Sequence, residues 1–430
     1  MAPALLGLFI NQQKNKGYIM AIKHIACAAI PLLMAALPTQ AITVEQLNKQ
    51  VQQMNKRIAE QDNKLRINGF ASFGLVQSDN ETGYHRGIAD EPNFRRYTKA
   101  GVQMTFNIDE STSVITQLVS KGENDFDTKA DWLYIKHSFG NGLTVKAGRL
   151  RKPNYLLSEF FDVGYAMPWT QPPVEVYGVL ESSANYEAAD LTYDFEIGDW
   201  SAYTQLQYGR SETSEVVSKN LLAFNFSMNN GDLTLRAGYS QADASIVAGS
   251  STATLVGGVN TAIASTDIAG ESASLGGTNK GTFFGLAAMY DNGQMVLISE
   301  YNSLAVDSVL ADQDGYYIMG GYRIGQWMPY LTIAHEETTD DSDRVATSIP
   351  ALSGAPATEA ATLAGINGAL AALNTEQDRT AIGVRYDWKP GVAIKVQYDM
   401  VDVGDTAGEF DATPTEDTAN ILSITIDTVF

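Results

Sequence analysis

The sequence contains almost no cysteine or histidine, and beyond its first 41 residues it has no long apolar run. Of 430 residues, one is cysteine and four are histidine. A single cysteine excludes a disulfide within the chain. Because a membrane-spanning helix needs about 18 or more consecutive apolar residues, any membrane span after residue 41 must be built from strands.

Basic residues are also scarce, with 29 Lys and Arg against 50 Asp and Glu and a net charge of -21. This balance argues against a nucleic-acid partner, because such proteins present a basic patch to the phosphates. After residue 41 the histidines are His85, His137 and His335, and no Ser/His/Asp set falls on matched positions. We therefore expect neither an enzyme nor a metal or cofactor site.

The residues that are abundant favour a sheet-rich exported protein. Hydrophobic residues make up 44% of the chain, with 37 Gly and 20 Tyr, and the mean hydropathy is -0.13. Glycine suits short turns, and tyrosine suits the interface between a membrane and water.

The first 41 residues predict a cleaved signal peptide. Residues 20–41 have a basic start, an apolar stretch and the small-residue end Ala41, so Met20 is the expected start and Ile42 the expected mature N-terminus. Alternatively, Lys14 and Lys16 lengthen the basic region. Lipidation of Cys27 is disfavoured because the apolar run follows it. Removal of 1–41 takes away three lysines and no acid, which gives a net charge of -24.

Residues 42–66 show a helical period. Their apolar positions follow a 3,4 spacing over three heptads, with Gln61 in the remaining seam position. We favour a periplasmic coiled coil joining the subunits of a trimer. A single amphipathic helix lying on another surface is the alternative. The seam residues are Val44, Leu47, Val51, Met54, Ile58 and Leu65.

From residue 67 to residue 430 the period changes to two. In 392–400, Val, Ile, Val, Tyr and Met alternate with Ala, Lys, Gln and Asp, which gives one apolar and one polar face. Short turns alternate with longer connections, and the two longest, about 243–278 and 338–376, are expected to be surface loops. We predict an all-β fold, a 16-stranded antiparallel transmembrane β-barrel, preceded by the short coiled-coil helix. The predicted strands are 67–78, 95–108, 112–121, 129–139, 143–150, 184–195, 199–210, 218–228, 232–242, 279–290, 294–303, 313–324, 326–337, 377–388, 391–401 and 419–430.

Strand parity assigns basic side chains to the lumen. Arg149 and Arg151 have the wrong parity, so a bulge near Gly148 is needed to bring them inside. The alternative for each of these charges is a solvated residue without an individual role. The predicted lumen-wall residues are Arg95, Lys99, Lys121, Lys136, Lys146, Arg236, Arg323, Arg379, Arg385 and Lys395.

The segment from residue 67 onward resembles the trimeric outer-membrane porins of Gram-negative bacteria. The resemblance rests on residues 69–74 (Gly-Phe-Ala-Ser-Phe-Gly), on Gly148-Arg149 before a long third loop, and on the terminal Phe430. It implies a homotrimer in the outer membrane, in contact with lipid and lipopolysaccharide, that passes small hydrophilic solutes. It also implies that Phe430 is an insertion signal. The heptads resemble those of a porin subgroup with a periplasmic coiled coil.

The resemblance further implies that the third loop, about 151–183, folds inward and narrows the pore. Its sequence departs from the general-porin pattern, which leaves pore size and selectivity open. Its aromatic residues form either a slide for sugars or, as we favour, apolar packing that pins the loop. The predicted constriction residues are Arg149, Arg151, Glu159, Asp162, Glu175 and Glu181.

Three other functions compete with general diffusion. A channel that prefers small organic anions or sugars fits the basic lumen. An adhesin or an outer-membrane enzyme fits less well, because a barrel of sixteen strands encloses an aqueous channel.

Overall fold

The computed structural model describes residues 64–180, 185–271, 278–308, 310–404, 406–412 and 414–430. The expected signal peptide, nearly all of the heptad segment and Glu181 lie outside these residues. Among the described residues, no helix is long and apolar enough to cross a membrane.

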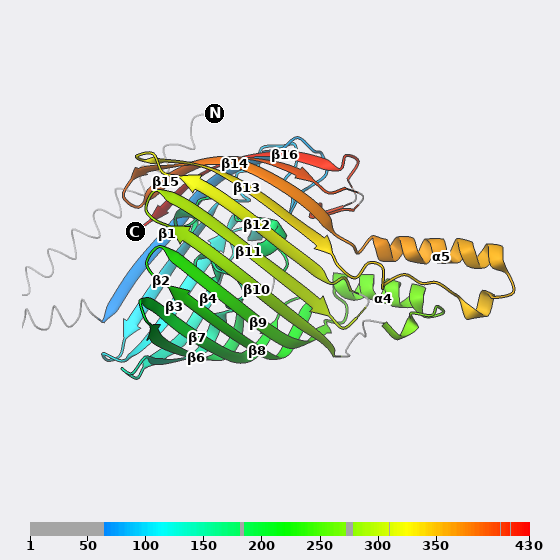
Figure 1. The fold of residues 1–430 in the computed structure, drawn as a ribbon, viewed down its shortest axis with the longest axis horizontal. Coiled ribbons are helices and arrows are strands. Elements are labelled where there is room, and N and C mark those ends of the chain that lie inside the picture. The colour runs from blue at the N-terminus through cyan, green and yellow to red at the C-terminus, as the bar shows by residue number, and fades with distance from the viewer. Residues whose placement is uncertain (1–63, 181–184, 272–277, 309, 405, 413) are drawn as a thin grey trace, which may run out of the picture. The chain divides into compact units, whose positions relative to one another are not determined.

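The described chain forms a closed barrel of sixteen antiparallel strands (Figure 1). Each strand pairs with its neighbours in sequence, and β1 closes the barrel by pairing with β16. The strands are β1 (Leu65–Ser78), β2 (Lys99–Asn107), β3 (Thr112–Lys121), β4 (Thr128–Ser138), β5 (Leu143–Arg151), β6 (Asn185–Ile197), β7 (Trp200–Glu212), β8 (Val216–Asn229), β9 (Leu233–Ile246), β10 (Asn279–Asp291), β11 (Met295–Val306), β12 (Gln313–Tyr322), β13 (Trp327–Thr338), β14 (Glu376–Lys389), β15 (Val392–Asp402) and β16 (Thr418–Val429).

The predicted barrel and its sixteen strands are confirmed, but several strand boundaries differ, and three of the differences move a residue that we had assigned. β2 begins at Lys99, so Arg95 lies in the preceding loop, and β12 ends before Arg323. Leu65, which we placed in the heptads, begins β1 and pairs with Phe106. In each case the pattern of hydrophobic residues continued across the residue at which the hydrogen-bonded strand begins or ends.

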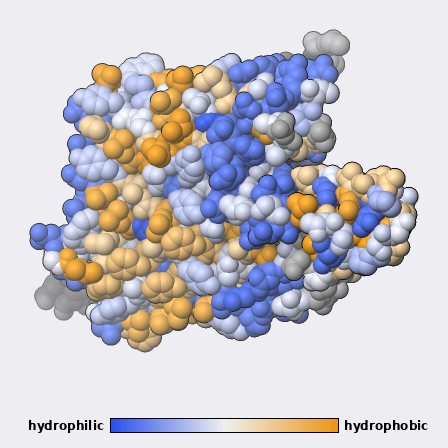
Figure 2. Space-filling model, turned by 45° about the vertical axis from the view of Figure 1, so that its right-hand side comes forward, coloured by the Kyte–Doolittle hydropathy of each residue, from blue (hydrophilic) through white to orange (hydrophobic). Residues whose placement is uncertain are grey.

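Alternation separates the two faces of the barrel wall. On β12, Ile318 is about half exposed, whereas Tyr317 and Met319 are fully buried. Because successive side chains of a strand point to opposite faces, Ile318 marks the outer surface and its neighbours mark the interior. Leu297 and Leu331 occupy equivalent outward positions. Figure 2 shows the resulting spread of hydrophobic residues over the barrel wall.

Two glycines allow aromatic rings to lie across neighbouring strands. At the closing pair, the backbone N–H groups and carbonyls of Gly69 and Phe430 exchange hydrogen bonds of 2.7 and 2.9 Å. A Cβ on Gly69 would lie 2.4 Å from the Phe430 ring, and one on Gly383 would lie 2.2 Å from the Tyr330 ring. Only glycine leaves room for these two rings.

The two long connections expected to be surface loops contain helices. α4 (Ser251–Ile263) begins at Ser250, whose hydroxyl accepts a hydrogen bond from Ala253 N, and α5 (Pro356–Ala371) has proline in its first turn. Such residues start helices because they cap the free N–H groups or lack one. The two helices share an apolar core that includes Val256 and Ile366. Figure 1 shows them side by side beyond one end of the barrel, which we call the loop end.

Candidate functional site

The segment between β5 and β6, residues 152–184, is called the inward loop, and its described part packs against the inner wall. Its described part, 152–180, contains η2 (Ser158–Phe160), η3 (Gly164–Ala166) and α3 (Val174–Tyr177). Tyr155, Trp169 and Tyr177 form one core with inward residues of β10–β13, including Tyr317 and Met319. The loop therefore fills the lumen beside these strands.

This packing decides between the two interpretations of the aromatic run. Tyr155, Trp169 and Tyr177 are at most 9% exposed, and the indole N–H of Trp169 donates a hydrogen bond of 2.8 Å to the Thr332 hydroxyl. These residues pin the loop to the wall rather than offering a surface to sugars. Phe160 differs, because about half of it is exposed.

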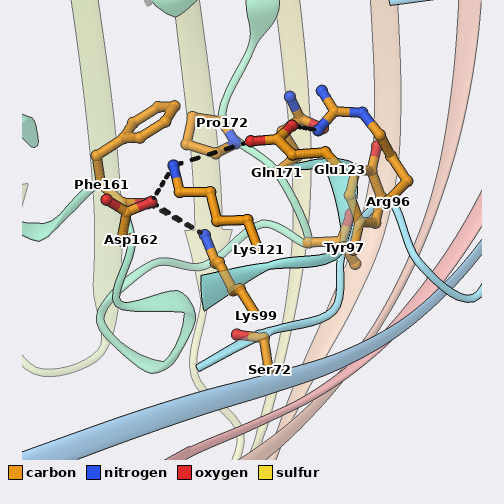
Figure 3. Close-up of a pocket in the computed structure, with 11 residues that line it drawn as sticks. Ser72, Arg96, Tyr97, Lys99, Lys121, Glu123, Phe161, Asp162, Gln171 and Pro172 are labelled. Atoms are coloured by element: carbon orange, nitrogen blue, oxygen red, sulfur yellow. Dashed lines mark hydrogen bonds and ion pairs between the residues drawn. The ribbon is translucent and has the colours of Figure 1, made fainter. Parts of the chain in front are cut away.

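Asp162 attaches the inward loop to the opposite side of the barrel, on β2, β3 and β5. Its carboxylate lies 2.7 Å from Lys121 Nζ, 3.0 Å from an Arg151 guanidinium nitrogen and 4.0 Å from Lys99 Nζ. Figure 3 shows both lysines converging on it beside the Phe161 ring. Burial opposes ionisation, but Lys121, Arg151 and Lys99 together hold the pKa of Asp162 well below its usual range.

Glu175 makes a second attachment, from α3 to β14. Its side chain is fully buried, and its carboxylate accepts a hydrogen bond of 2.9 Å from Arg379 Nε. Arg379 also donates to the Tyr84 hydroxyl at 2.7 Å and lies 3.3 Å from Asp399. Because all of these groups are buried, the ion pair fixes α3 to the wall and to the loop between β1 and β2.

Three more of the predicted lumen-wall residues bind the backbone of the inward loop. Lys395 Nζ donates to the carbonyls of Gly164 and Trp169 at 2.6 and 2.8 Å. Arg385 donates to those of Tyr165 and Met167 at 2.7 and 2.9 Å, and Arg236 donates to that of Pro153. Much of the basic wall therefore holds the loop in place instead of facing open water.

The arrangement differs from the expected ladder of acids and bases facing each other across a water-filled gap. Asp162 and Glu175 are at most 2% exposed and lie in direct ion pairs. Of the four predicted loop acids, the structure leaves Glu159 exposed, with its carboxylate 4.0 Å from Lys146 Nζ, and Glu181 is not described. Burial of the first two follows from the packing of the whole loop onto the wall.

Two predicted lumen-wall arginines lie elsewhere. Arg95 is exposed in the loop before β2 and pairs with Asp125. Arg323 follows β12 and binds both carboxylate oxygens of Asp291, at 2.5 and 2.8 Å, beside the turn that follows β10. Lys136, by contrast, lies on β4 directly opposite Lys146.

The β-bulge that we expected at Gly148 does not occur. β5 pairs with β4 and β6 without a shift, although Gly148 has φ +135°. The irregularity lies instead between β3 and β4, where Asp131 has no opposite residue. Arg149 donates to the Ala130 carbonyl at 2.8 Å and pairs with Glu187 at 2.6 Å. Arg151 reaches Asp162 from the end of the strand.

The inner wall opposite the apolar half is lined by polar side chains. Asp190 accepts hydrogen bonds of 2.5 Å from both Gln205 and Gln207, and Gln117 donates to Gln103 at 3.3 Å. These residues lie on β2, β3, β6 and β7. Side-chain amides bonded to one another in this way leave a fixed, hydrophilic surface.

Our reading of the sequence missed several residues of this site. Arg96, rather than Arg95, is buried and pairs with Glu123 beside Asp162 (Figure 3). Asp427, which pairs with Lys395 at 3.0 Å, and Glu300, which accepts hydrogen bonds from Tyr177 and Tyr317, are inward acids on strands. Strand parity would have found these two acids, because they alternate with outward apolar residues just as the wall lysines do.

A cavity of about 610 Å³ opens beside this site at the loop end. Arg149 and Arg151 from β5, Lys129 and Asp131 from β4, and Glu215 from the loop after β7 contribute to its lining. We call it the vestibule. It carries charges of both signs.

Comparison with known proteins gives one family and several similar folds. The model of the Gram-negative porin family matches residues 28–406. No curated protein sequence matches significantly.

The similar solved structures are outer-membrane proteins. Salmonella typhi OmpF in complex with daunomycin has a TM-score of 0.54 at 11% identity, covering 86% of this chain and 99% of its own. An anion-selective porin from Comamonas acidovorans has a TM-score of 0.53 at 10% identity, covering 85% and 99%. OmpT of Vibrio cholerae in a trimer form has a TM-score of 0.51 at 13% identity, covering 85% and 100%. At such identities the likeness is one of fold.

Proposed function

Because this chain belongs to the Gram-negative porin family and is an outer-membrane channel for passive diffusion of small hydrophilic solutes, we propose that its permeation path follows the polar half of the inner wall. One observation carries the proposal. The inward loop fills the lumen beside β10–β13 with apolar side chains, whereas the opposite wall presents amides and charges.

Solutes enter through the vestibule and then pass between the wall and the exposed edge of the inward loop. Glu159 on the loop and Lys146 on β5 are the charged pair at this passage, 4.0 Å apart. Lys136, opposite Lys146 on β4, adds a second cation. Charges of both signs orient dipolar solutes and favour polar over apolar ones, and they leave the channel with weak ion selectivity.

The assembly and export of the chain form the second part of the proposal. We infer that it is a homotrimer, with the heptads of 42–64 as a coiled coil, and that residues 1–41 are a cleaved signal peptide. The heptad spacing, the family, and the trimer form of a similar fold support this. The outward apolar residues contact membrane lipid and lipopolysaccharide. The family and the fold are those of a channel rather than of an enzyme.

Cysteine labelling tests the path, because the single native cysteine, Cys27, lies in the expected signal peptide. Gln103→Cys places a thiol on the polar half, and Ala334→Cys places one in the apolar core of the other half. In planar bilayers, a charged thiosulfonate reagent should lower the conductance of Gln103→Cys and leave Ala334→Cys unchanged. Equal effects on the two variants would contradict the proposed path.

A further inference from the structure

A second cavity, of about 270 Å³, lies at the loop end between the start of the inward loop, strands β8–β11 and α4. Its lining is largely apolar and includes Leu221, Ile246, Phe283, Leu304 and Leu310. It shares Thr213 and Glu215 with the vestibule. A solute in the vestibule therefore lies next to it.

In the described lining of this cavity, Lys152 is the one cation and Glu215 the one carboxylate. Lys152 directly follows β5 and is 6% exposed. Within the described part of the chain, its ammonium group has no ion pair and no hydrogen bond. Burial lowers the pKa of Lys152 to about 8, which shows the cost of holding a charge there.

The other ionisable groups around the cavity already have partners. Arg151 is paired with Asp162 at 3.0 Å. The Glu215 carboxylate accepts hydrogen bonds from Thr252 N at 2.9 Å and the Ser251 hydroxyl at 3.0 Å, at the start of α4. Tyr177, which lines a smaller cavity together with Lys152, donates to Glu300. Lys152 is therefore a cation that makes no ion pair with a described residue, and Glu215 is held by α4.

A buried ammonium group is costly in an apolar environment unless an anion accompanies it. An inorganic anion would neutralise the charge but would leave the apolar lining, including Leu221, Phe283 and Leu304, without a partner. An apolar solute would fill the cavity but leave the charge unpaired. The combination fits a solute that carries one carboxylate and a short hydrocarbon chain.

We propose that this cavity is a binding site for small amphipathic monocarboxylates, with the carboxylate on Lys152 and the chain against Leu221, Phe283 and Leu304. The inference deepens the proposed channel function, because solutes bound beside the vestibule are concentrated where they enter. It gives the channel a preference for one class of organic anion.

Calorimetry on the folded full-length protein in mild detergent tests the binding, with butanoate, hexanoate and hexylammonium as probes and empty micelles subtracted. Each methylene buried in an apolar site strengthens binding about fourfold, so hexanoate should bind about fifteen times more tightly than butanoate. Hexylammonium should not bind. Equal affinities of the two carboxylates, or binding of hexylammonium, would overturn the proposal.

Two variants separate the charge from the apolar lining. Lys152→Met removes the ammonium group and should weaken hexanoate binding about tenfold or more, and Ala244→Phe should abolish binding by filling the cavity. Lys129→Met is the matched control, because Lys129 is an exposed lysine of the vestibule, and it should leave the affinity unchanged. Unchanged binding in Lys152→Met, or an equal loss in Lys129→Met, would refute the site.

The pH dependence gives a readout that does not depend on a substitution. Raising the pH from 7 to 9.5 deprotonates Lys152, so hexanoate affinity should fall in the wild type and stay constant in Lys152→Met. A constant affinity in the wild type would count against the lysine. KCl conductance measured in parallel reports the channel itself: conduction without hexanoate binding refutes this site alone, and binding without conduction refutes the proposed function alone.

Discussion

Asp162→Asn is the substitution that should most directly test how the inward loop is held. The aspartate lies within 4.0 Å of three cations, Lys121, Arg151 and Lys99, and is 2% exposed. Asparagine keeps the size of the side chain but removes its charge. The three cations would then face one another without their shared counter-ion.

The expected cost is about 3 kcal/mol, the lower end of the range for breaking a buried ion pair. The lower end applies because two partners retain weaker contacts, Lys121 with Glu123 at 3.9 Å and Arg151 with Asp131 at 3.9 Å. The apolar core around Trp169 still holds the rest of the loop. We therefore expect local release of the segment near Asp162 rather than loss of the barrel.

Single-channel recording and thermal unfolding in detergent measure the two consequences. Asp162→Asn should give larger and noisier conductance and a lower unfolding temperature than wild type. Glu159→Gln is the matched control, because it removes a charge three residues away that is exposed and makes one contact of 4.0 Å; its cost should be at most about 1 kcal/mol. If Asp162→Asn and Glu159→Gln show the same current noise and the same unfolding temperature, Asp162 does not hold the loop.

The same ion pairs predict how the loop responds to acid. The pKa of Asp162 is lower in the folded protein than the value of about 3.9 for an unfolded chain. The stabilisation is therefore complete above about pH 4 and is lost as the pH falls through the lower folded value. The noise of the wild-type single-channel current should stay low from pH 8 to pH 5 and rise only in stronger acid. Noise appearing near pH 5 would contradict the ion-pair account.

The remaining predictions concern assembly, insertion and packing. Deleting 42–64 should weaken the trimer and leave the barrel folded, as measured by sedimentation in mild detergent, and a monomeric intact protein would exclude the coiled coil. Phe430→Ala should lower the amount of protein recovered in the outer membrane, whereas unchanged recovery would remove its role as an insertion signal. Gly383→Ala should cost about 1–3 kcal/mol by displacing the Tyr330 ring; Gly320→Ala, whose added Cβ would lie an ordinary 3.5 Å from Leu297, is the control in thermal unfolding, and equal effects would argue against the clash.

Much of the barrel could be predicted because a strand repeats every two residues. Parity alone placed Lys395 and Arg379 on the inner face, and both are buried there against the inward loop. Parity does not tell where a strand ends, and beyond its end a shift of one residue decides whether a side chain is buried or exposed. Arg95 and Arg96 show this, because the first is exposed and the second is buried against Glu123.

The position of the inward loop could not be predicted from the sequence. Its contacts join residues far apart in the chain, such as Trp169 with Thr332 and Lys395 with Gly164, and an alternating pattern specifies a face but not a partner. The helices were missed for a different reason. The described part of α5 buries few apolar side chains, chiefly Ile366 and Leu370, and these are too sparse among Ala, Gly and Thr to show a helical period.

The connectivity of the barrel concentrates the long-range part of folding at one seam. Every strand pair except β1–β16 joins neighbours in sequence, so each of those hairpins forms at a small loop-closure cost. A chain with all of its hairpins formed would still expose two unpaired edges, on β1 and β16, each able to pair with another molecule. The exchange of hydrogen bonds between Gly69 and Phe430 lies at this seam, so it marks the point at which an aggregation-prone open sheet becomes a finished barrel.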